Sequence, residues 1–220
     1  MKRNVDSDID IKTSGMDYVN PKAKVVIVGI TPGKSQMKKS RVGKSAKEIK
    51  RENAFAGRMR PNLIRMLDAI GVNRLLNIKT CDTLWSTDFD QVQMTSLLTN
   101  ATYYKGEMFK GTPSILSTPR LMKELMDGFV AHDCRGCKKA ILYVALGSKV
   151  EKVLISLKKQ GELTAPIVTI PHASGFNGGR VAVFLKKRSP KDSNTAELRA
   201  AEMRRVAKKT MSKLLASRQG

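Results

Sequence analysis

The segment Gly33-Lys34-Ser35 has the residue types that end a phosphate-binding loop, so its spacing decides whether it binds a nucleoside triphosphate. Such a loop requires a glycine five residues before the Gly-Lys pair, because the loop length sets where its backbone amides point. That position holds Val28, and the nearest glycine, Gly29, stands one residue too close. The spacing therefore argues against a nucleoside triphosphatase.

A second chemical pattern is the CxxC pair of Cys134 and Cys137, which follows His132. A structural zinc site uses four ligands, commonly from two paired motifs. The rest of the chain offers one further cysteine, Cys81, and one further histidine, His172. We therefore expect two thiols in a loop and no metal centre.

The elements that must position a site follow from the hydrophobic pattern. Apolar, β-branched runs predict buried strands over residues 23–30, 94–101, 140–146 and 166–170. Apolar residues at helical spacing predict helices over residues 57–70, 119–130, 149–159 and 195–217. Gly71 is expected to end the first of these helices, and Ser148 to cap the third. Strands that alternate with helices indicate an α/β fold with a doubly wound parallel sheet.

Polar residues end or follow the predicted strands. They are Thr31, Asn100, Ser148 and His172, in the order of the strands along the chain. Ligands of doubly wound sheets bind outside the carboxyl ends of the strands. We therefore expect these residues to lie at one edge of the sheet and to form a site.

Five segments carry a family resemblance: residues 29–33 (GITPG), 53–57 (NAFAG), 98–101 (LTNA), 145–147 (ALG) and 171–175 (PHASG). In this order and spacing, across residues 23–188, they resemble the motifs of the uracil-DNA glycosylase superfamily, especially its bacterial thermostable-type branches. The resemblance implies a three-layer α/β/α sandwich with a central, mainly parallel four-stranded sheet. This chain lacks the cysteines that hold an iron–sulfur cluster in one branch, so no cluster and no other cofactor is expected.

The resemblance implies roles for the residues around a flipped base. Phe55 would stack on the base, beside the backbone of Gly29 and Ile30. Asn100 would pair with O4 and N3–H of uracil, because its amide group both accepts and donates. His172 would donate a hydrogen bond to O2, where negative charge develops as the glycosidic bond breaks. Without the resemblance, Phe55 is equally explained by core packing, Asn100 by a strand-end turn and His172 by internal partners.

The same resemblance implies contacts with the DNA backbone. Amides and hydroxyls of two loops would hold phosphates, and Phe176 with Asn177 would fill the gap left by the flipped base. The DNA-binding residues so implied are Gly33, Lys34, Ser35, Ser174, Gly175, Phe176, Asn177 and Arg180. Each basic residue in this set is also explained as a solvated surface charge.

Thr31 departs from the family pattern, which places Asp, Asn or Glu there to activate or orient water. A threonine hydroxyl can orient a water molecule, but it is no general base at neutral pH. A weak enzyme can survive this loss, and Asp88 or Asp90 could also supply a carboxylate from elsewhere. Ala173 replaces the usual proline of the second motif, which affects the rigidity of that loop. One branch of the superfamily uses its histidine as a covalent nucleophile, and this chemistry stays open for His172.

The chain is strongly basic, with 41 Lys and Arg against 19 Asp and Glu among 220 residues and a formal net charge of +22. This charge predicts a polyanionic partner, which the resemblance specifies as uracil-containing DNA, single- or double-stranded. No apolar run reaches the roughly 18 residues of a membrane span, and three cysteines indicate a reducing compartment. We therefore expect a monomeric cytoplasmic protein that does not contact membranes.

Three parts of the chain are expected: an arm at residues 1–22, a glycosylase-like domain at 23–188 and a basic helix at 189–220. The basic helix is predicted to add DNA affinity and no chemistry. Within the domain, the basic residues 34–52 predict a mobile loop with one polar helical turn. Residues 76–80 predict a short strand.

These observations predict a DNA glycosylase of base excision repair, which hydrolyses the N-glycosidic bond of uracil or a related deaminated base. Thr31 would position the water and His172 would stabilise the leaving base. The alternative is a catalytically weak or silent protein of the same fold that recognises uracil-containing or damaged DNA. A third interpretation, an RNA-processing or ribosome-associated protein, would show a preference for RNA and indifference to uracil in DNA.

Overall fold

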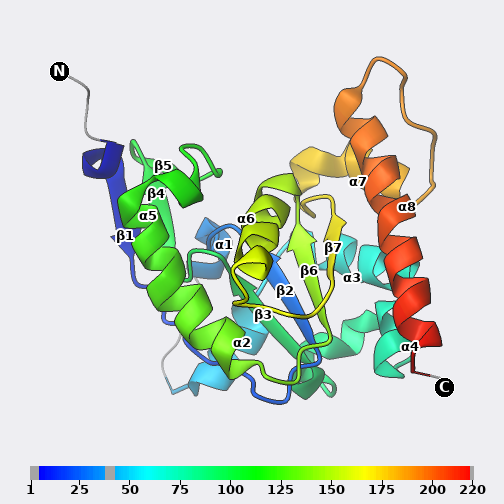
Figure 1. Ribbon diagram of the computed structural model, residues 1–220, viewed down its shortest axis with the longest axis horizontal. Helices are drawn as coiled ribbons and strands as arrows, with labels where there is room; N and C mark the ends of the chain where they lie inside the picture. Colours follow the sequence, from blue (N-terminus) through cyan, green and yellow to red (C-terminus); the bar gives the residue numbers. More distant parts are fainter. Residues whose placement is uncertain (1–4, 38–42, 219–220) are drawn as a thin grey trace.

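A four-stranded parallel sheet forms the centre of the molecule (Figure 1). The computed structural model describes residues 5–37 and 43–218, without the side chains of Ser35 and Phe176. The strands lie in the order β3 (Val92–Ser96), β2 (Val25–Gly29), β6 (Leu142–Leu146) and β7 (Ile167–Ile170), and all neighbours are parallel. Burial on both faces explains the continuous apolar runs of β2 and β6. The prediction of an α/β fold with a parallel sheet is confirmed.

Helices cover both faces of this sheet. Val25 and Ile27 of β2 belong to one buried cluster, whereas Val26 and Val28 belong to the other, because successive side chains of a strand alternate. The first cluster includes residues of α3 (Met59–Ile70), α4 (Val72–Leu76), α7 (Gly178–Phe184) and α8 (Thr195–Ala216). The second includes residues of α5 (Pro119–Glu124), the π-helix η5 (Leu125–Cys134) and α6 (Ser148–Lys159). This layering is compatible with a three-layer α/β/α sandwich.

The N-terminal segment packs onto the molecule as an edge element. After the turn η1 (Val5–Asp8), strand β1 (Ile9–Lys12) pairs antiparallel with β4 (Ala101–Tyr104), which pairs with β5 (Glu107–Met108). Ser14 and Asn20 of the predicted arm are buried. The side-chain amide of Asn20 donates to the carbonyl of Val92, 3.0 Å away. The segment is therefore fixed to both sheets.

Residues 34–52 are largely helical where the sequence predicts a mobile loop. They form α1 (Lys34–Met37) and α2 (Ala46–Asn53), while residues 38–42 lie outside the described part of the chain. Ser45 and Glu48 begin α2 with a capping box. The ammonium group of Lys50 is buried and donates to the carbonyl of Met16, 2.7 Å away. A buried lysine on a mostly polar helix concealed the amphipathic pattern.

Other element boundaries also differ from the predictions. The predicted strand at 76–80 is replaced by the end of α4, a left-handed turn at Asn77 (φ 56°) and a short segment whose last residue, Thr80, caps η2 (Cys81–Trp85). Strand β3 ends at Ser96, so Asn100 lies four residues beyond it. Ser148 is the first residue of α6 and makes no capping bond. Short 3-10 turns complete the chain at η3 (Phe89–Gln91), η4 (Ile115–Ser117) and η6 (Gly175–Asn177).

Two predicted helices, α5 and α8, are more extensive or more tightly packed than the sequence indicates. Gly71 ends α3 in the left-handed conformation (φ 94°), as predicted, whereas α5 continues through η5 as far as Cys134. Helix α8 packs against α7 and β7, and its Ala207 and Met211 belong to the sheet-bound core. It is therefore part of the folded unit and no separate appendage. Within the described residues, no helix combines the length and apolar character that crossing a membrane requires.

Candidate functional site

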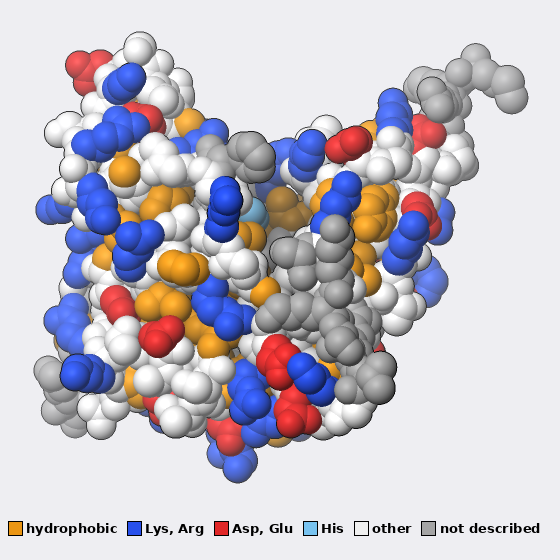
Figure 2. Space-filling view, turned by 180° about the vertical axis from the view of Figure 1, so that it is seen from behind, with side chains coloured by type: hydrophobic (Ala, Val, Ile, Leu, Met, Phe, Trp, Pro, Cys, Tyr) orange, Lys and Arg blue, Asp and Glu red, His pale blue; other side chains and the backbone are white. Residues whose placement is uncertain are grey.

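A cavity of about 680 Å³ lies at the carboxyl ends of β2, β6 and β7. Its walls come from the turn after β2, the segment after β5, the start of α6, the loop after β7, and helices α7 and α8. Figure 2 shows the surface hollowed between its left and right parts, with Lys and Arg side chains on both sides of the hollow. This is the edge of the sheet at which the sequence predicts a site.

The cavity collects most of the predicted site residues. Those that line it are Gly29, Ile30, Thr31, Gly33, Phe55, His172, Asn177 and Arg180. Four other predicted residues are not among its lining: Lys34, Asn100, Ser174 and Gly175. The predictions for Ser35 and Phe176 concern side chains outside the described part of the structure.

His172 is held as a hydrogen-bond donor toward the cavity. Its Nδ1 accepts a long hydrogen bond from the backbone N–H of Ser174, with 3.4 Å between the nitrogens. Burial lowers the pKa of His172 from its ordinary value, which favours the neutral ring. When Nδ1 of a neutral imidazole accepts, Nε2 carries the proton and donates. Asn62 of α3 fixes the same loop by donating to the carbonyl of Ala173, 3.0 Å away.

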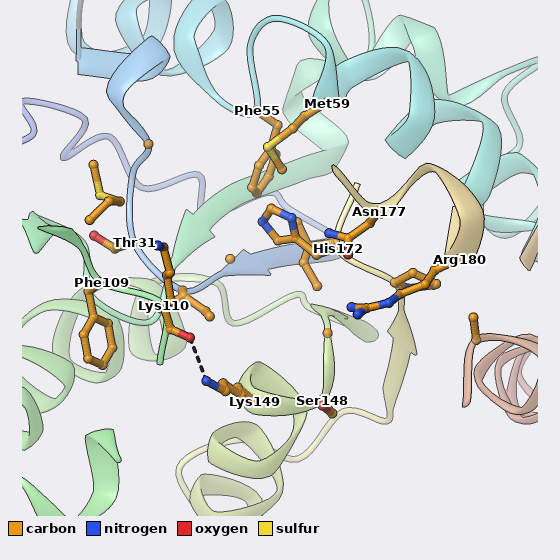
Figure 3. Close-up of a pocket in the computed structure, with 18 of the residues that line it drawn as sticks. Thr31, Phe55, Met59, Phe109, Lys110, Ser148, Lys149, His172, Asn177 and Arg180 are labelled. Atoms are coloured by element: carbon orange, nitrogen blue, oxygen red, sulfur yellow. Dashed lines mark hydrogen bonds between the residues drawn. The ribbon is translucent and has the colours of Figure 1, made fainter. Parts of the chain in front are cut away.

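Phe55 lies near His172 in the cavity and is buried (Figure 3). Its backbone has a φ of 50°, a conformation that is rare for a bulky residue and costs free energy. A Cβ atom on Gly29 would stand 3.4 Å from the Phe55 ring, so the ring lies close to the end of β2. The aromatic face and the imidazole donor are thereby presented to the same space.

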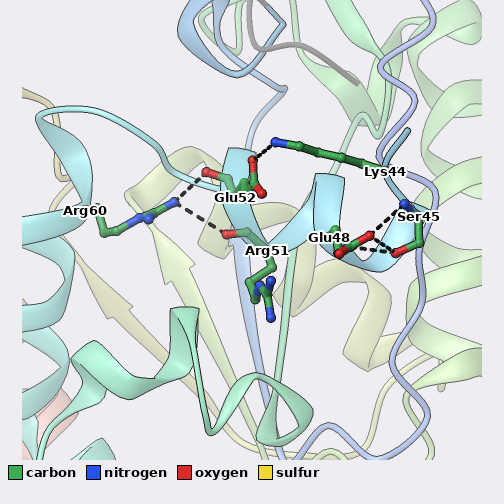
Figure 4. A network of polar contacts seen from close by, with 6 residues as sticks. All are labelled: Lys44, Ser45, Glu48, Arg51, Glu52 and Arg60. Carbon is green, nitrogen blue, oxygen red and sulfur yellow. Dashed lines mark hydrogen bonds and ion pairs between the residues drawn. The ribbon is translucent and has the colours of Figure 1, made fainter. Parts of the chain in front are cut away.

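Two residues that the sequence analysis did not identify hold the backbone just before Phe55. The indole N–H of Trp85 donates to the carbonyl of Ala54, 2.9 Å away. The guanidinium of Arg60 donates to the same carbonyl (3.3 Å) and to that of Glu52 (2.7 Å; Figure 4), and lies over the Trp85 ring. Such bonds stabilise the unusual conformation of Phe55. No simple sequence signal predicts them, because the Trp85 bond spans 31 residues and the Arg60 bonds depend on how the chain turns between α2 and α3.

Thr31 lines the cavity, but its hydroxyl group serves the fold. It donates to the carbonyl of Asn100 and accepts from the N–H of Thr102, each at 2.9 Å. A hydroxyl has one proton and two lone pairs, so Thr31 keeps one lone pair for a further donor. It can accept a hydrogen bond from water but has no proton left to give.

Asn100 is turned to internal partners, which conflicts with the prediction that it reads a base. Its side-chain oxygen accepts from the N–H of Ser14 (3.1 Å), and its side-chain nitrogen donates to the carboxylate of Glu124 (2.9 Å). Its backbone N–H reaches the same carboxylate at 3.2 Å. The residue follows a bend after β3 and immediately precedes β4, so it joins the N-terminal segment to α5.

The cavity is cationic. Its described lining contains Lys110, Lys149, Arg180 and Arg199 but no aspartate or glutamate. The ammonium group of Lys149 donates to the carbonyl of Lys110 and the hydroxyl of Thr112. Among the described residues, neither Arg180 nor Arg199 has a hydrogen-bond or ion-pair partner. Neither Asp88 nor Asp90 lines the cavity, and Asp90 pairs with Lys47. The described lining therefore attracts anions and offers no carboxylate base.

The candidate metal ligands do not assemble in the described part of the chain. Across residues 5–37 and 43–218, no three His, Cys, Asp or Glu side chains are grouped as they would be around a metal ion. Cys134 and Cys137 are buried free thiols, and burial raises the pKa of each to about 12. A thiol that holds its proton so strongly is a poor nucleophile at neutral pH.

Comparison with known proteins connects the chain to one bacterial relative. Over 187 residues it is 30% identical to the uncharacterized protein YoxB of Bacillus subtilis (strain 168), a match that spans 78% of this chain and 73% of YoxB. No protein-family model matches the chain, and no solved structure matches it. The identity extends over most of both sequences, and the chain therefore belongs to the same family as YoxB.

Proposed function

We propose that the protein is a DNA glycosylase that hydrolyses the N-glycosidic bond of uracil or a related deaminated base. The observation that carries this proposal is the cavity in which Phe55 and neutral His172 lie together. An aromatic face suits a flipped pyrimidine, and a fixed N–H donor suits the carbonyl oxygen of a departing base. The ordered resemblance of five segments to the uracil-DNA glycosylase superfamily, including its three-layer fold, supports the same function.

In this reaction the C1′–N bond of the nucleotide breaks and its electron pair leaves with the base. A water oxygen forms a new bond to C1′, and the proton released from water is taken up by the base or solvent. His172 stabilises the negative charge on the base through its Nε2–H. A single donor of this kind typically contributes about 3–4 kcal/mol to catalysis.

The water has no carboxylate to activate it in the described lining of the cavity. The remaining lone pair of the Thr31 hydroxyl can accept a hydrogen bond from this water molecule and so orient it. General-base catalysis contributes about 10²–10⁴-fold in enzymes that use it. We therefore expect slow turnover, in which stabilisation of the leaving base by His172 is the dominant contribution.

DNA is the proposed partner because the cavity and the whole chain are cationic. Arg180 and Arg199 are free to contact phosphates, and the net charge of +22 favours association with any polyanion. The structure gives no role in reading the base to Asn100, whose amide group is already bonded on both sides. Selectivity would therefore rest on cavity shape and on His172.

A single-turnover cleavage assay tests the proposal. Labelled oligonucleotides with uracil, hypoxanthine or xanthine, single-stranded and duplex, are incubated with excess protein and then treated with alkali to cut abasic sites. The native protein should release uracil, and His172→Ala should lower the rate at saturation by about 10²–10³-fold. His132→Ala is the matched control, because His132 is the other histidine of the chain and lies outside the cavity. Equal rates for native and His172→Ala proteins would refute this role of His172.

A second candidate function is recognition of uracil-containing DNA without catalysis. It is favoured by the internal hydrogen bonds of Thr31 and Asn100. By the family resemblance, Thr31 stands at the position that activates water, and Asn100 stands at the position that reads the base. In the same assay this protein would bind DNA but release no base of any kind. A protein–DNA band that survives denaturation would instead identify covalent attack by His172.

A further inference from the structure

Helix α8 forms one wall of the cavity, although the sequence assigns it only an accessory role. Its residues Ala196, Arg199, Ala200 and Met203, here called the α8 wall, line the cavity together with Arg180 of α7 and Met59 of α3. Figure 3 shows that Arg180 lies on the far side of His172 from Thr31. The α8 wall therefore extends the site beyond the end at which Phe55 and His172 would receive a base.

The start of α8 is fixed in place. Glu197 is 5% exposed, forms an ion pair with Arg188 and accepts a hydrogen bond from the N–H of Lys191 (3.1 Å). A Cβ atom on Gly179 would stand 3.0 Å from the Glu197 carboxylate, so a larger residue there would push this side chain aside. With Ala207 and Met211 in the core, the helix presents a preformed wall to the cavity.

The chemistry of this part of the cavity is both apolar and cationic. Met59, Met203 and the two alanines offer apolar surface, while Arg180 and Arg199 are exposed and have no partner among the described residues. A nucleotide has the complementary parts, an apolar base face and an anionic phosphate. The volume of about 680 Å³ falls in the range that encloses drug-sized ligands and exceeds what one pyrimidine ring needs.

We propose that the α8 wall and Arg180 form a second nucleotide subsite, which binds the nucleotide adjacent to the one whose base enters the Phe55–His172 end. The base of this neighbour lies on Met59 and Met203, and its phosphate is held by Arg180 and Arg199. This inference rests on the nucleic-acid ligand of the proposed function but not on base release.

Binding of short ligands tests the subsite directly. Calorimetric titration at one fixed salt concentration compares thymidine 5′-monophosphate with the 5′-phosphorylated dinucleotide pTpT. The native protein should bind the dinucleotide about tenfold more tightly, because a second base and phosphate are accommodated. Arg199→Ala should remove most of this gain and reduce the salt dependence of oligonucleotide binding by about one counterion.

Arg205→Ala is the matched control on the same helix. Arg205 is exposed, pairs with Glu202 and does not line the cavity, so this variant should keep the full dinucleotide gain. Met203→Ser tests the apolar half and should reduce the gain without changing the salt dependence. Equal losses in Arg199→Ala and Arg205→Ala would overturn the subsite, because the effect would then be general electrostatics.

The outcomes also separate this inference from the proposed function. Uracil release with no dinucleotide gain would overturn the subsite alone. A dinucleotide gain that depends on Arg199, in a protein that releases no base, would overturn glycosylase activity and support the subsite. A native protein that binds neither ligand and releases no base would overturn both.

Discussion

The two halves of the site differ in whether their side-chain groups are free to contact a ligand or are already bonded within the protein. At the Phe55–His172 half, an aromatic ring and an imidazole lie in the cavity. The hydrogen bonds that hold this half use backbone groups, namely the N–H of Ser174 and the carbonyl of Ala54. At the Thr31–Asn100 half, the polar side chains bond to other segments of the chain. In sequence, both halves contain residues of the segments that resemble glycosylase motifs, although Thr31 departs from the pattern. A motif therefore places a residue near a site, whereas its side-chain atoms serve a ligand only if no internal partner takes them.

The largest effect that tests this difference is expected from Asn100→Leu. The substitution leaves the buried N–H of Ser14 without a partner and leaves the Glu124 carboxylate with only the backbone N–H of residue 100, so it should lower the free energy of unfolding by about 2–3 kcal/mol. The rate of base release per folded molecule should stay unchanged. Urea denaturation and the single-turnover assay measure the two quantities.

Asn73→Ala serves as the control for this experiment. The Asn73 side chain makes one hydrogen bond to the carbonyl of Lys79 at the surface, so its loss should change stability by less than about 0.5 kcal/mol. If Asn100→Leu kept native stability and lost selectivity for uracil, Asn100 would belong to the working half of the site.

Thr31→Val should produce a smaller loss of stability. It leaves the buried N–H of Thr102 unpaired, while the carbonyl of Asn100 keeps the hydroxyl of Thr102 as a donor, at a cost of about 1–2 kcal/mol. Base release should fall far less than in His172→Ala, and Thr31→Ser should restore both properties. Unfolding midpoints and saturated rates are compared for the three proteins. A rate loss as large as that of His172→Ala, at native stability, would make Thr31 the essential water ligand and erase the contrast between the halves.

Trp85→Phe should act on binding through Phe55. It removes the N–H that holds the carbonyl of Ala54 while it keeps an aromatic ring beneath Arg60. If poorer positioning of Phe55 costs about 1 kcal/mol of substrate-binding free energy, KM should rise roughly fivefold, with little change in the saturated rate. Because Trp85 is the single tryptophan, its fluorescence in the native protein should also change when the cavity is filled. A fall in the saturated rate with an unchanged KM would argue against this role.

The smallest effect concerns the protonation of His172. Burial lowers its pKa in the folded protein, so the unfolded chain takes up a proton first as the pH falls below about 6.5. Stability should therefore decrease from about pH 6.5 down to the folded pKa and then level off. An NMR titration of the imidazole protons measures this pKa, and His172→Ala identifies the signal and should flatten the acid slope. A His172 signal that titrates above pH 6.5 would contradict the burial effect.

Some elements could be predicted from the sequence because they depend on residues that are close together along the chain. β2 and β6 show continuous apolar runs because both of their faces are buried, and Gly71 supplies the left-handed residue that ends α3. The basic residues at 34–52 predicted a mobile loop, and the capping box of Ser45 and Glu48 emerged only in the structure. The buried position of Lys50 was not readable, because it depends on a carbonyl in the distant N-terminal segment.

The amino-acid sequence by itself determined the parallel sheet, the edge at which the cavity lies and the position of His172 near that edge, because apolar periodicity and strand ends are local properties. Phe55 was expected there only from the family resemblance of its segment. Only the tertiary structure decided that Asn100 and Thr31 hold segments together, that Trp85 and Arg60 support Phe55, and that α8 closes the cavity. The physical reason is that each polar group can satisfy only a limited number of hydrogen bonds, and chain segments far apart in sequence compete for them.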